Sequence, residues 1–268
     1  MKNISRVFLR IGIAIMLLSA TLSLIGLLWE ELYQDTNLLI VEGWWMNDWV
    51  TLLLAVPLFA IAIFLGKKGS KHGFGLLVGL MMYTVYNYSF YLFGAAFNAV
   101  FLGYVVVFVL GLFGLLTGAL TLFTLLRKED VPSIKVARVI SIYMVVTALF
   151  LCIGWVGQWL SFVVTGTTPA LMEQLEATNH LVAALDLTFV VPWFIFGAVL
   201  LWKYRVSGLI VSLMVHMKTV IYNVILLWSS ISQHTSGVEG AIDFIPLWGF
   251  FFVGSSAAMV GLLRSLKK

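Results

Sequence analysis

Two ionisable residues, Asp186 and Lys218, interrupt long apolar segments and are the side chains best placed to do chemistry. If both segments are membrane helices rising about 1.5 Å per residue, Asp186 lies about 8 Å below one surface and Lys218 lies at about 15 Å, near the bilayer centre. A lysine side chain of about 6 Å spans most of that difference, so an ion pair between adjacent helices is feasible. Such charges form either a static pair or a proton or substrate site, and both interpretations stay open.

Tyrosine and asparagine side chains occur at similar depth in other apolar segments. Tyr83, Asn87 and Tyr91 fall on one helical stripe. Lipid offers no hydrogen-bond partners to these side chains, so the stripe should face protein or a cavity. The stripe could supply hydrogen bonds between helices, at about 0.6 kcal/mol each, or line an aromatic pocket for a small amphipathic or cationic ligand. The predicted intramembrane polar site comprises Asp186, Lys218, Tyr222, Asn223, Tyr86, Asn87, Tyr83, Tyr91 and Gln158.

No catalytic constellation accompanies these residues. Cys152 is the single cysteine, and the chain has no CxxC, HExxH, GxGxxG or GxxxxGK[ST] motif. No serine–histidine pair or pair of carboxylates converges at one depth, so neither a nucleophile nor an acid–base couple is indicated. The sequence therefore predicts no catalytic residue, no metal site and no cofactor, and it favours a protein that is not an enzyme.

The composition is that of a membrane protein. Of 268 residues, 62% are hydrophobic and 10% are charged, whereas soluble domains average about 25% charged. Too few charges remain to cover a soluble fold. The net charge of +4 comes from short basic clusters between apolar segments, which indicates membrane orientation and argues against nucleic acid as a partner.

Eight apolar segments predict an all-α membrane protein with eight transmembrane helices in a single domain, residues 1–268. They cover residues 7–29, 49–66, 74–97, 99–126, 139–164, 181–202, 207–228 and 245–263. Of the 16 basic residues, 15 lie at the termini or in every second connection, and the alternate connections are acidic. The positive-inside rule then predicts a multi-pass protein of the cell membrane with both termini in the cytoplasm.

The longest connection, about 30–48, is acidic and carries Trp44 and Trp45 beside the apolar stretch 38–41. Tryptophan favours the headgroup level, so we expect this connection to lie on the outer leaflet without crossing it. A lid or a vestibule that attracts cations is the functional alternative.

The second and third segments resemble the sixth and seventh. The matches pair Val56-Pro57-Leu58-Phe59 with Val191-Pro192-Trp193-Phe194, residues 75–81 with 208–214, and Tyr86-Asn87 with Tyr222-Asn223. We therefore expect two parallel four-helix repeats, residues 1–127 and 128–268. An even number of spans keeps both repeats in the same orientation, so a pseudo-two-fold axis would run along the membrane normal.

Small residues recur on one face of the fourth and eighth segments. They are Gly111, Gly114 and Gly118, and Gly254, Ala258 and Gly261. Such faces permit helices to approach closely, so they predict packing within the chain or a homodimer.

The stretch from Tyr86 to Gly94, YNYSFYLFG, with Phe97-Asn98 after it, resembles a group of bacterial multi-span integral membrane proteins that have no known activity. Leu185-Asp186-Leu187 and Val190-Val191-Pro192 extend the likeness. The resemblance implies a polytopic membrane fold over most of the chain, and it assigns no functional residue.

These features favour a small secondary transporter or a small-ligand-binding membrane protein, surrounded by lipid and acting on a small molecule or an ion. The alternative is a non-catalytic assembly, immunity or sensor subunit, in which the polar residues only hold helices together. An intramembrane lipid-modifying enzyme fits least, because the sequence offers no nucleophile or metal cluster.

Overall fold

The computed structural model describes residues 2–238 and 240–267, and every regular element in that part of the chain is helical. Within these described residues, eight helical spans are long and apolar enough to cross a membrane, which confirms the predicted number. In chain order the spans are α1 (Lys2–Leu28), α2–η1–α3 (Leu38–Val50, Thr51–Ala55, Val56–Lys67), α4 (Lys71–Phe93), α5 (Phe101–Leu125), α6 (Ile134–Thr165), α8–η3–α9 (Leu181–Leu185, Asp186–Val190, Val191–Trp202), α10 (Val206–Thr235) and α11 (Ile245–Ser265). Two short helices, η2 (Lys128–Asp130) and α7 (Ala170–Gln174), lie in the connections.

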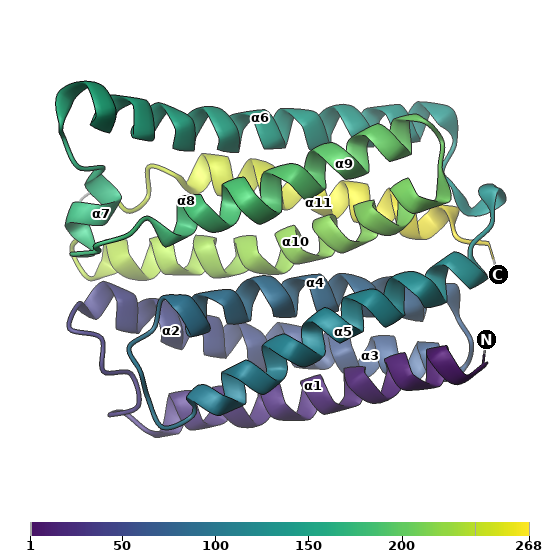
Figure 1. Ribbon diagram of the computed structural model, residues 1–268, viewed down its shortest axis with the longest axis horizontal. Coiled ribbons are helices and arrows are strands. Elements are labelled where there is room, and N and C mark those ends of the chain that lie inside the picture. Colours follow the sequence, from purple (N-terminus) through teal and green to yellow (C-terminus); the bar gives the residue numbers. More distant parts are fainter. Residues whose placement is uncertain (1, 239, 268) are drawn as a thin grey trace.

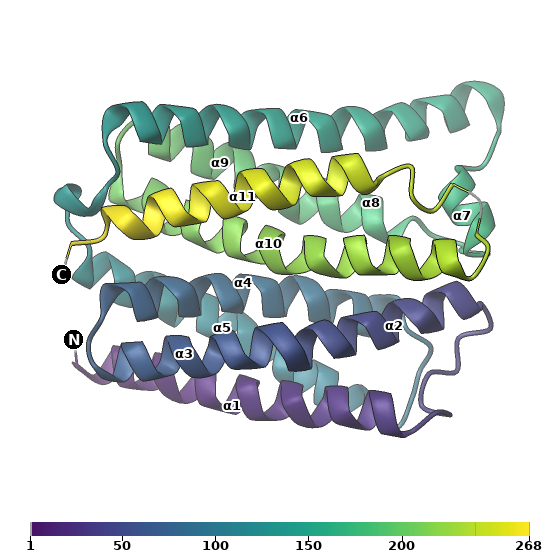
Figure 2. The same ribbon diagram turned by 180° about the vertical axis from the view of Figure 1, so that it is seen from behind.

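Two helices, α4 and α10, form the centre of the molecule. Helices α1 to α5 lie on one side and α6 to α11 on the other, and α4 and α10 pack against each other between the two groups (Figures 1 and 2). Within the most apolar stretch of each central helix 83% of the residues are buried, against 39% or less in the other six spans. Because protein surrounds α4 and α10 on most sides, these helices can carry polar side chains that lipid would not tolerate.

A glycine allows the two central helices to approach closely. Gly79 of α4 lies against Met217 of α10, and a Cβ at this position would overlap the Met217 side chain and lie 2.9 Å from the Leu213 carbonyl oxygen. Helix association in lipid depends largely on van der Waals packing, since lipid tails are as apolar as the helices themselves. The close approach at Gly79 therefore helps to hold the two groups of helices together.

The small faces predicted on the fourth and eighth spans pack within the chain. Gly111 and Gly114 of α5 lie against the α4 side chains Val85 and Met81, and Gly254 of α11 lies against the ring of Tyr143 in α6. Adding a Cβ at any of these three glycines would crowd its neighbour. The close approach that these faces permit is thus used between helices of one chain.

Two spans contain a widened helical turn just before a proline. In η1 the Val56 N–H bonds to the Thr51 carbonyl, and in η3 the Val191 N–H bonds to the Asp186 carbonyl, which is five residues back in both cases. Pro57 and Pro192 follow directly. A proline has no N–H to donate and its ring crowds the carbonyl four residues earlier, so the wider turn accommodates it within a continuous helix.

The prediction for residues 30–48 was wrong over most of its length. Residues 38–50 form α2, which continues through η1 into α3 as one span. Asp48 lies inside that span and is 2% exposed, and Trp44 is also buried. The acidic residues gave this stretch the composition of a surface loop. Tyr33 of the α1–α2 connection and Tyr91 of α4 bond to Asp48, however, so the stretch can cross among protein neighbours.

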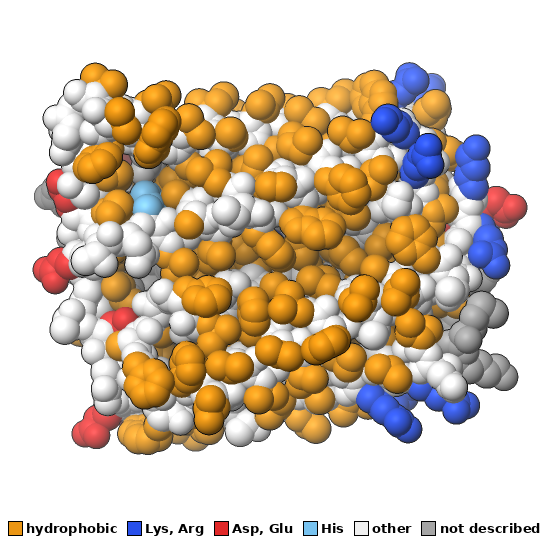
Figure 3. Space-filling model, viewed as in Figure 1, with side chains coloured by type: hydrophobic (Ala, Val, Ile, Leu, Met, Phe, Trp, Pro, Cys, Tyr) orange, Lys and Arg blue, Asp and Glu red, His pale blue; other side chains and the backbone are white. Residues whose placement is uncertain are grey.

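The charged side chains divide between the two ends of the bundle. Lys and Arg gather at the end where α1 begins and α11 ends, and acidic side chains gather mostly at the opposite end (Figures 1 and 3). Asp130 is the buried exception at the basic end, where its carboxylate accepts bonds from Lys71 Nζ at 2.9 Å and from the N–H groups of Arg127 and Lys267. Burial alone would raise the pKa of Asp130, but these donors outweigh it and hold the pKa below its usual value. The contacts tie α4, the α5–α6 connection and the C-terminal segment together.

The contact at Gly79 predicts that Gly79→Ala lowers the thermal unfolding temperature of the purified protein in detergent. Overpacking of this kind costs about 1–3 kcal/mol, because the nearest atoms include the Leu213 backbone as well as a side chain. Gly154→Ala in α6 is the matched control, since no atom lies within 4 Å of its added Cβ. The control should be neutral or slightly stabilising, by roughly 0.5–1 kcal/mol of helix propensity. Equal unfolding temperatures for the two variants would contradict the close approach of α4 and α10.

Candidate functional site

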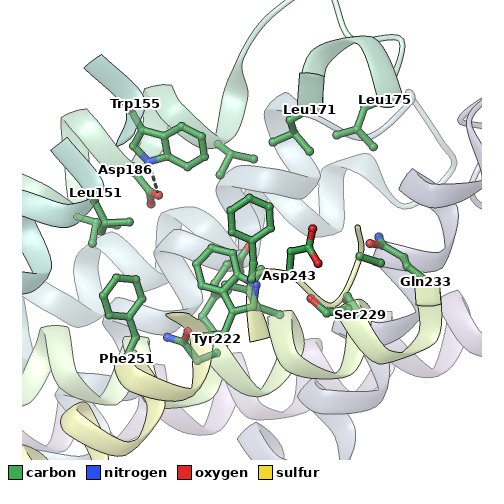
Figure 4. Close-up of a pocket in the computed structure, with 18 of the residues that line it drawn as sticks. Leu151, Trp155, Leu171, Leu175, Asp186, Tyr222, Ser229, Gln233, Asp243 and Phe251 are labelled. Carbon is green, nitrogen blue, oxygen red and sulfur yellow. Dashed lines mark hydrogen bonds between the residues drawn. The ribbon is translucent and has the colours of Figure 1, made fainter. Parts of the chain in front are cut away.

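A cavity of about 1030 Å³ lies within the second group of helices. Its walls come from α6, the span α8–η3–α9, α10, α11 and the short helix α7 (Figure 4). The α6 and α11 backbones approach each other at few positions and the two helices meet mainly through side chains such as Tyr143, whereas the α1 and α5 backbones pack closely in the first group. The lining includes Glu173 and Asp243, which belong to the connections at the acidic end, and Lys218 and Tyr86, which belong to the central helices α10 and α4.

Asp186 provides a carboxylate at the wall of the cavity. It is the first residue of η3, and its side chain is 6% exposed. The Tyr86 hydroxyl donates to Asp186 Oδ1 at 2.7 Å, and the Trp155 indole N–H donates to Oδ2 at 2.9 Å (Figure 4). These two donors come from α4 and α6, so the carboxylate joins the central helix to the outer wall. Hydrogen bonds to a charged acceptor are about twice as strong as neutral ones.

Lys218 provides the opposite charge from the middle of α10. Its Nζ lies 3.4 Å from the centre of the Tyr86 ring and 5.2 Å from that of Tyr222, so two π faces stabilise the ammonium. No described residue accepts a hydrogen bond from it. The direct ion pair that we considered feasible does not form, since no N–O distance of 4.0 Å or less joins Asp186 and Lys218. Tyr86 connects them instead, by its hydroxyl to one and its ring face to the other.

Three further predicted residues, Tyr222, Asn223 and Gln158, also line the cavity. The Tyr222 ring meets that of Tyr86 edge-on at 4.8 Å, which places an α10 side chain against an α4 side chain at the base of the site. Gln158 lies farther out, with its Oε1 3.2 Å from His180 Nε2. Burial lowers the pKa of His180, although Asp186 opposes this, so burial favours the neutral imidazole.

The remaining predicted residues, Tyr83, Asn87 and Tyr91, lie outside the cavity. Tyr83 and Thr51 share a hydrogen bond of 2.9 Å, and Tyr91 donates to Asp48 at 2.9 Å. Asn87 is completely buried, and neither polar atom of its amide has a hydrogen-bond partner within the described chain. Tyr83 and Tyr91 of the stripe therefore bond to the first group of helices, while Tyr86 reaches into the second.

Sequence reasoning missed two residues that matter to these polar centres. Asp48 is enclosed by α1, α2 and α4, where it accepts bonds from Tyr33 and Tyr91, and it has no cationic partner within 4.0 Å in the described chain. Its position directly before an apolar segment that starts at Trp49 was the available signal. Trp155 lies three residues before Gln158 on α6, so helical spacing could have placed it beside the predicted site.

The eight apolar spans are those of a polytopic membrane protein. Comparisons of the chain with protein families, with curated proteins and with solved structures find no match. The resemblance to bacterial multi-span proteins therefore stays a prediction. Within residues 2–238 and 240–267, no three His, Cys, Asp or Glu side chains lie close enough to hold a metal ion.

The bond to Asp186 predicts that Tyr86→Phe is more destabilising than Tyr83→Phe. Both changes remove one hydroxyl from a buried α4 tyrosine and keep the ring. Tyr86 loses a bond to a carboxylate, worth about 2 kcal/mol, and Tyr83 loses a bond to a neutral hydroxyl, worth about 1 kcal/mol. Thermal unfolding in detergent at pH 7 measures both. A Tyr86→Phe variant no less stable than Tyr83→Phe would show that Asp186 does not accept a charge-assisted bond from Tyr86.

Proposed function

We propose that the protein is a small secondary transporter that binds a small solute in the cavity described above. The observation that carries the proposal is a cavity of about 1030 Å³ that extends from the acidic end to a carboxylate and an ammonium deep among the helices. A static pair needs no such space, because protein interiors normally pack around buried groups without large voids. Ligand sites combine mostly apolar walls with a few converging polar groups, which is the character of this lining.

The two halves of the chain support a transporter architecture, and we infer that residues 1–127 and 128–268 are parallel repeats. The widened turns at residues 51–55 and 186–190 are 135 residues apart. The turns that end these spans keep the same spacing of 135 residues. Gly69 in the first turn and Tyr204 in the second both have left-handed backbones, with φ values of 76° and 56°, respectively. Paired four-helix repeats would be related by a pseudo-two-fold axis along the membrane normal, with α4 and α10 facing each other across it.

The spacing of 135 residues refines the match between the repeats. Glycines in the following helices, Gly73 and Gly208, both lie against the backbone of the preceding helix, so Gly73 and not Gly75 would correspond to Gly208. By the same spacing Thr51 and Tyr83, which are hydrogen-bonded, would correspond to Asp186 and Lys218. The second repeat would thus carry charges where the first carries neutral hydroxyls.

We propose, further, that the basic end of the bundle faces the cytoplasm of a cell, with both termini on that side. Short connections rich in Lys and Arg are retained in the cytoplasm during membrane insertion. The cavity would then open toward the exterior, because Glu173 and Asp243 line it near the acidic end.

The orientation predicts which introduced cysteines react with an impermeant thiol reagent in intact cells. In a Cys152→Ala background, Thr36→Cys and Thr167→Cys should be labelled, because both positions are exposed near the acidic end. Ser133→Cys, exposed at the basic end, should be labelled only after the membrane is permeabilised. Labelling of Ser133→Cys in intact cells would overturn the proposed orientation.

The binding function predicts that a screen of small solutes finds compounds that stabilise the purified protein. A ligand at about 100 times its Kd adds about 2.7 kcal/mol. Asp186→Asn and Lys218→Met should each raise the Kd of such a ligand about tenfold and so weaken the stabilisation. The matched variants Thr51→Val and Tyr83→Phe alter the neutral pair in the first half, away from the cavity, and should leave Kd unchanged.

Transport itself is measured by exchange of the labelled solute across proteoliposomes. Exchange above that of empty liposomes, lost in Asp186→Asn and Lys218→Met, is the expected result. Binding at the cavity without exchange would favour a sensor subunit in place of a transporter. A screen that finds no solute dependent on Asp186 or Lys218 would contradict the binding function altogether.

A further inference from the structure

We propose that the solute is a small zwitterion with an apolar body, whose ammonium binds Asp186 and whose carboxylate binds Lys218. This inference rests on the proposed function, because it assigns a ligand class to the same cavity. An amino acid with an aliphatic or aromatic side chain is the simplest molecule of this class.

The first argument is that both charges have binding capacity to spare. The Lys218 ammonium has three N–H donors and, in the described chain, no hydrogen-bond acceptor for any of them. The Asp186 carboxylate accepts two hydrogen bonds, from Tyr86 and Trp155, although its oxygens offer about four acceptor positions. Asp186 and Lys218 are each 6% exposed, and both line the cavity. The spare donors and acceptors therefore face space that a ligand could occupy.

The second argument concerns net charge. Asp186 and Lys218 together are neutral, and no N–O distance of 4.0 Å or less joins them directly. A ligand with a single charge would leave an excess charge deep in a low-dielectric interior, which is costly. A zwitterion adds two charges of opposite sign and keeps the site neutral, while each of its ends meets an opposite charge.

The third argument comes from the rest of the lining. Glu173 and Asp243 lie on the path from the acidic end, so the potential there disfavours a simple anion. The Tyr86 and Tyr222 rings, which could otherwise attract a simple organic cation, already hold the Lys218 ammonium. Leu151, Phe194, Leu226 and Phe251 supply apolar walls suited to the body of the ligand.

The test compares three molecules that share one body and differ in charge. They are phenylalanine, 3-phenylpropionate, which lacks the ammonium, and phenethylamine, which lacks the carboxylate; leucine, 4-methylpentanoate and 3-methylbutylamine form a second series. Binding to the full-length purified protein is measured by ligand-dependent thermal stabilisation. At least one zwitterion should bind wild type about tenfold or more tightly than its anionic and cationic analogues.

Single substitutions should change the preferred charge in opposite directions. Lys218→Met leaves Asp186 alone and should favour the amine of the series, whereas Asp186→Asn leaves Lys218 alone and should favour the carboxylate. Tyr83→Phe, outside the cavity, is the matched control and should keep the preference for the zwitterion. A substitution that only destabilises the fold would weaken the binding of all three molecules equally. A change in which molecule binds best therefore separates an effect on recognition from an effect on stability.

Three results would overturn the inference. The first is that the wild-type protein binds a singly charged analogue as tightly as the zwitterion. The second is that both variants lose affinity for all three molecules to the same extent. The third is failure of both zwitterions to bind while the solute screen finds a ligand of another charge that depends on Asp186 or Lys218; the binding function would then stand without the zwitterion. If no solute of any charge binds, the binding function fails as well.

Discussion

The packing of α4 against α10 is the contact on which the other polar features depend. Intramembrane polar groups need protein partners, because lipid offers none. These two helices are the most enclosed in the molecule, and Gly79 lets them approach closely. As a result Tyr86, which belongs to α4, reaches Asp186 in η3 and lies beneath the ammonium of Lys218 in α10. One tyrosine thus connects the two groups of helices through the charges that the sequence singled out.

The two groups satisfy their buried polar side chains in different ways. In the first group, two tyrosine hydroxyls bond to Asp48, Thr51 bonds to Tyr83, and α1 packs closely against α5. In the second group, α6 and α11 meet mainly through side chains such as Tyr143, and a cavity lined by both helices extends to Asp186 and Lys218. A closed polar cluster contributes to stability, whereas charges that line a void remain available to a ligand. This difference is why the proposed site lies in the second group alone.

The widened turn at η3 contributes to the position of Asp186. Pro192 requires a local departure from regular helix, and Asp186 is the residue at which that departure begins. The Asp186 backbone carbonyl accepts the Val191 N–H within this turn. The Asp186 side chain accepts from Tyr86 and Trp155. Widened turns of this type occur frequently at functional sites. Here the widened turn η3 carries Asp186, a carboxylate that lines the cavity beside Lys218.

The sequence by itself determined the membrane class, the eight spans and the residues that had to avoid lipid. Hydropathy and charge act along the chain, so they report which segments cross and roughly how deep each residue lies. Only the tertiary structure decided that Asp48 lies inside a span, that Tyr86 separates Asp186 from Lys218, and that Tyr83 and Tyr91 face away from both. Depth follows from position in the sequence, but the rotation of each helix and the choice of its neighbours depend on packing among all eight. The cavity is the clearest case, because residues of α6, η3, α10 and α11 line it together, and no local pattern in any one helix encodes how these helices are spaced.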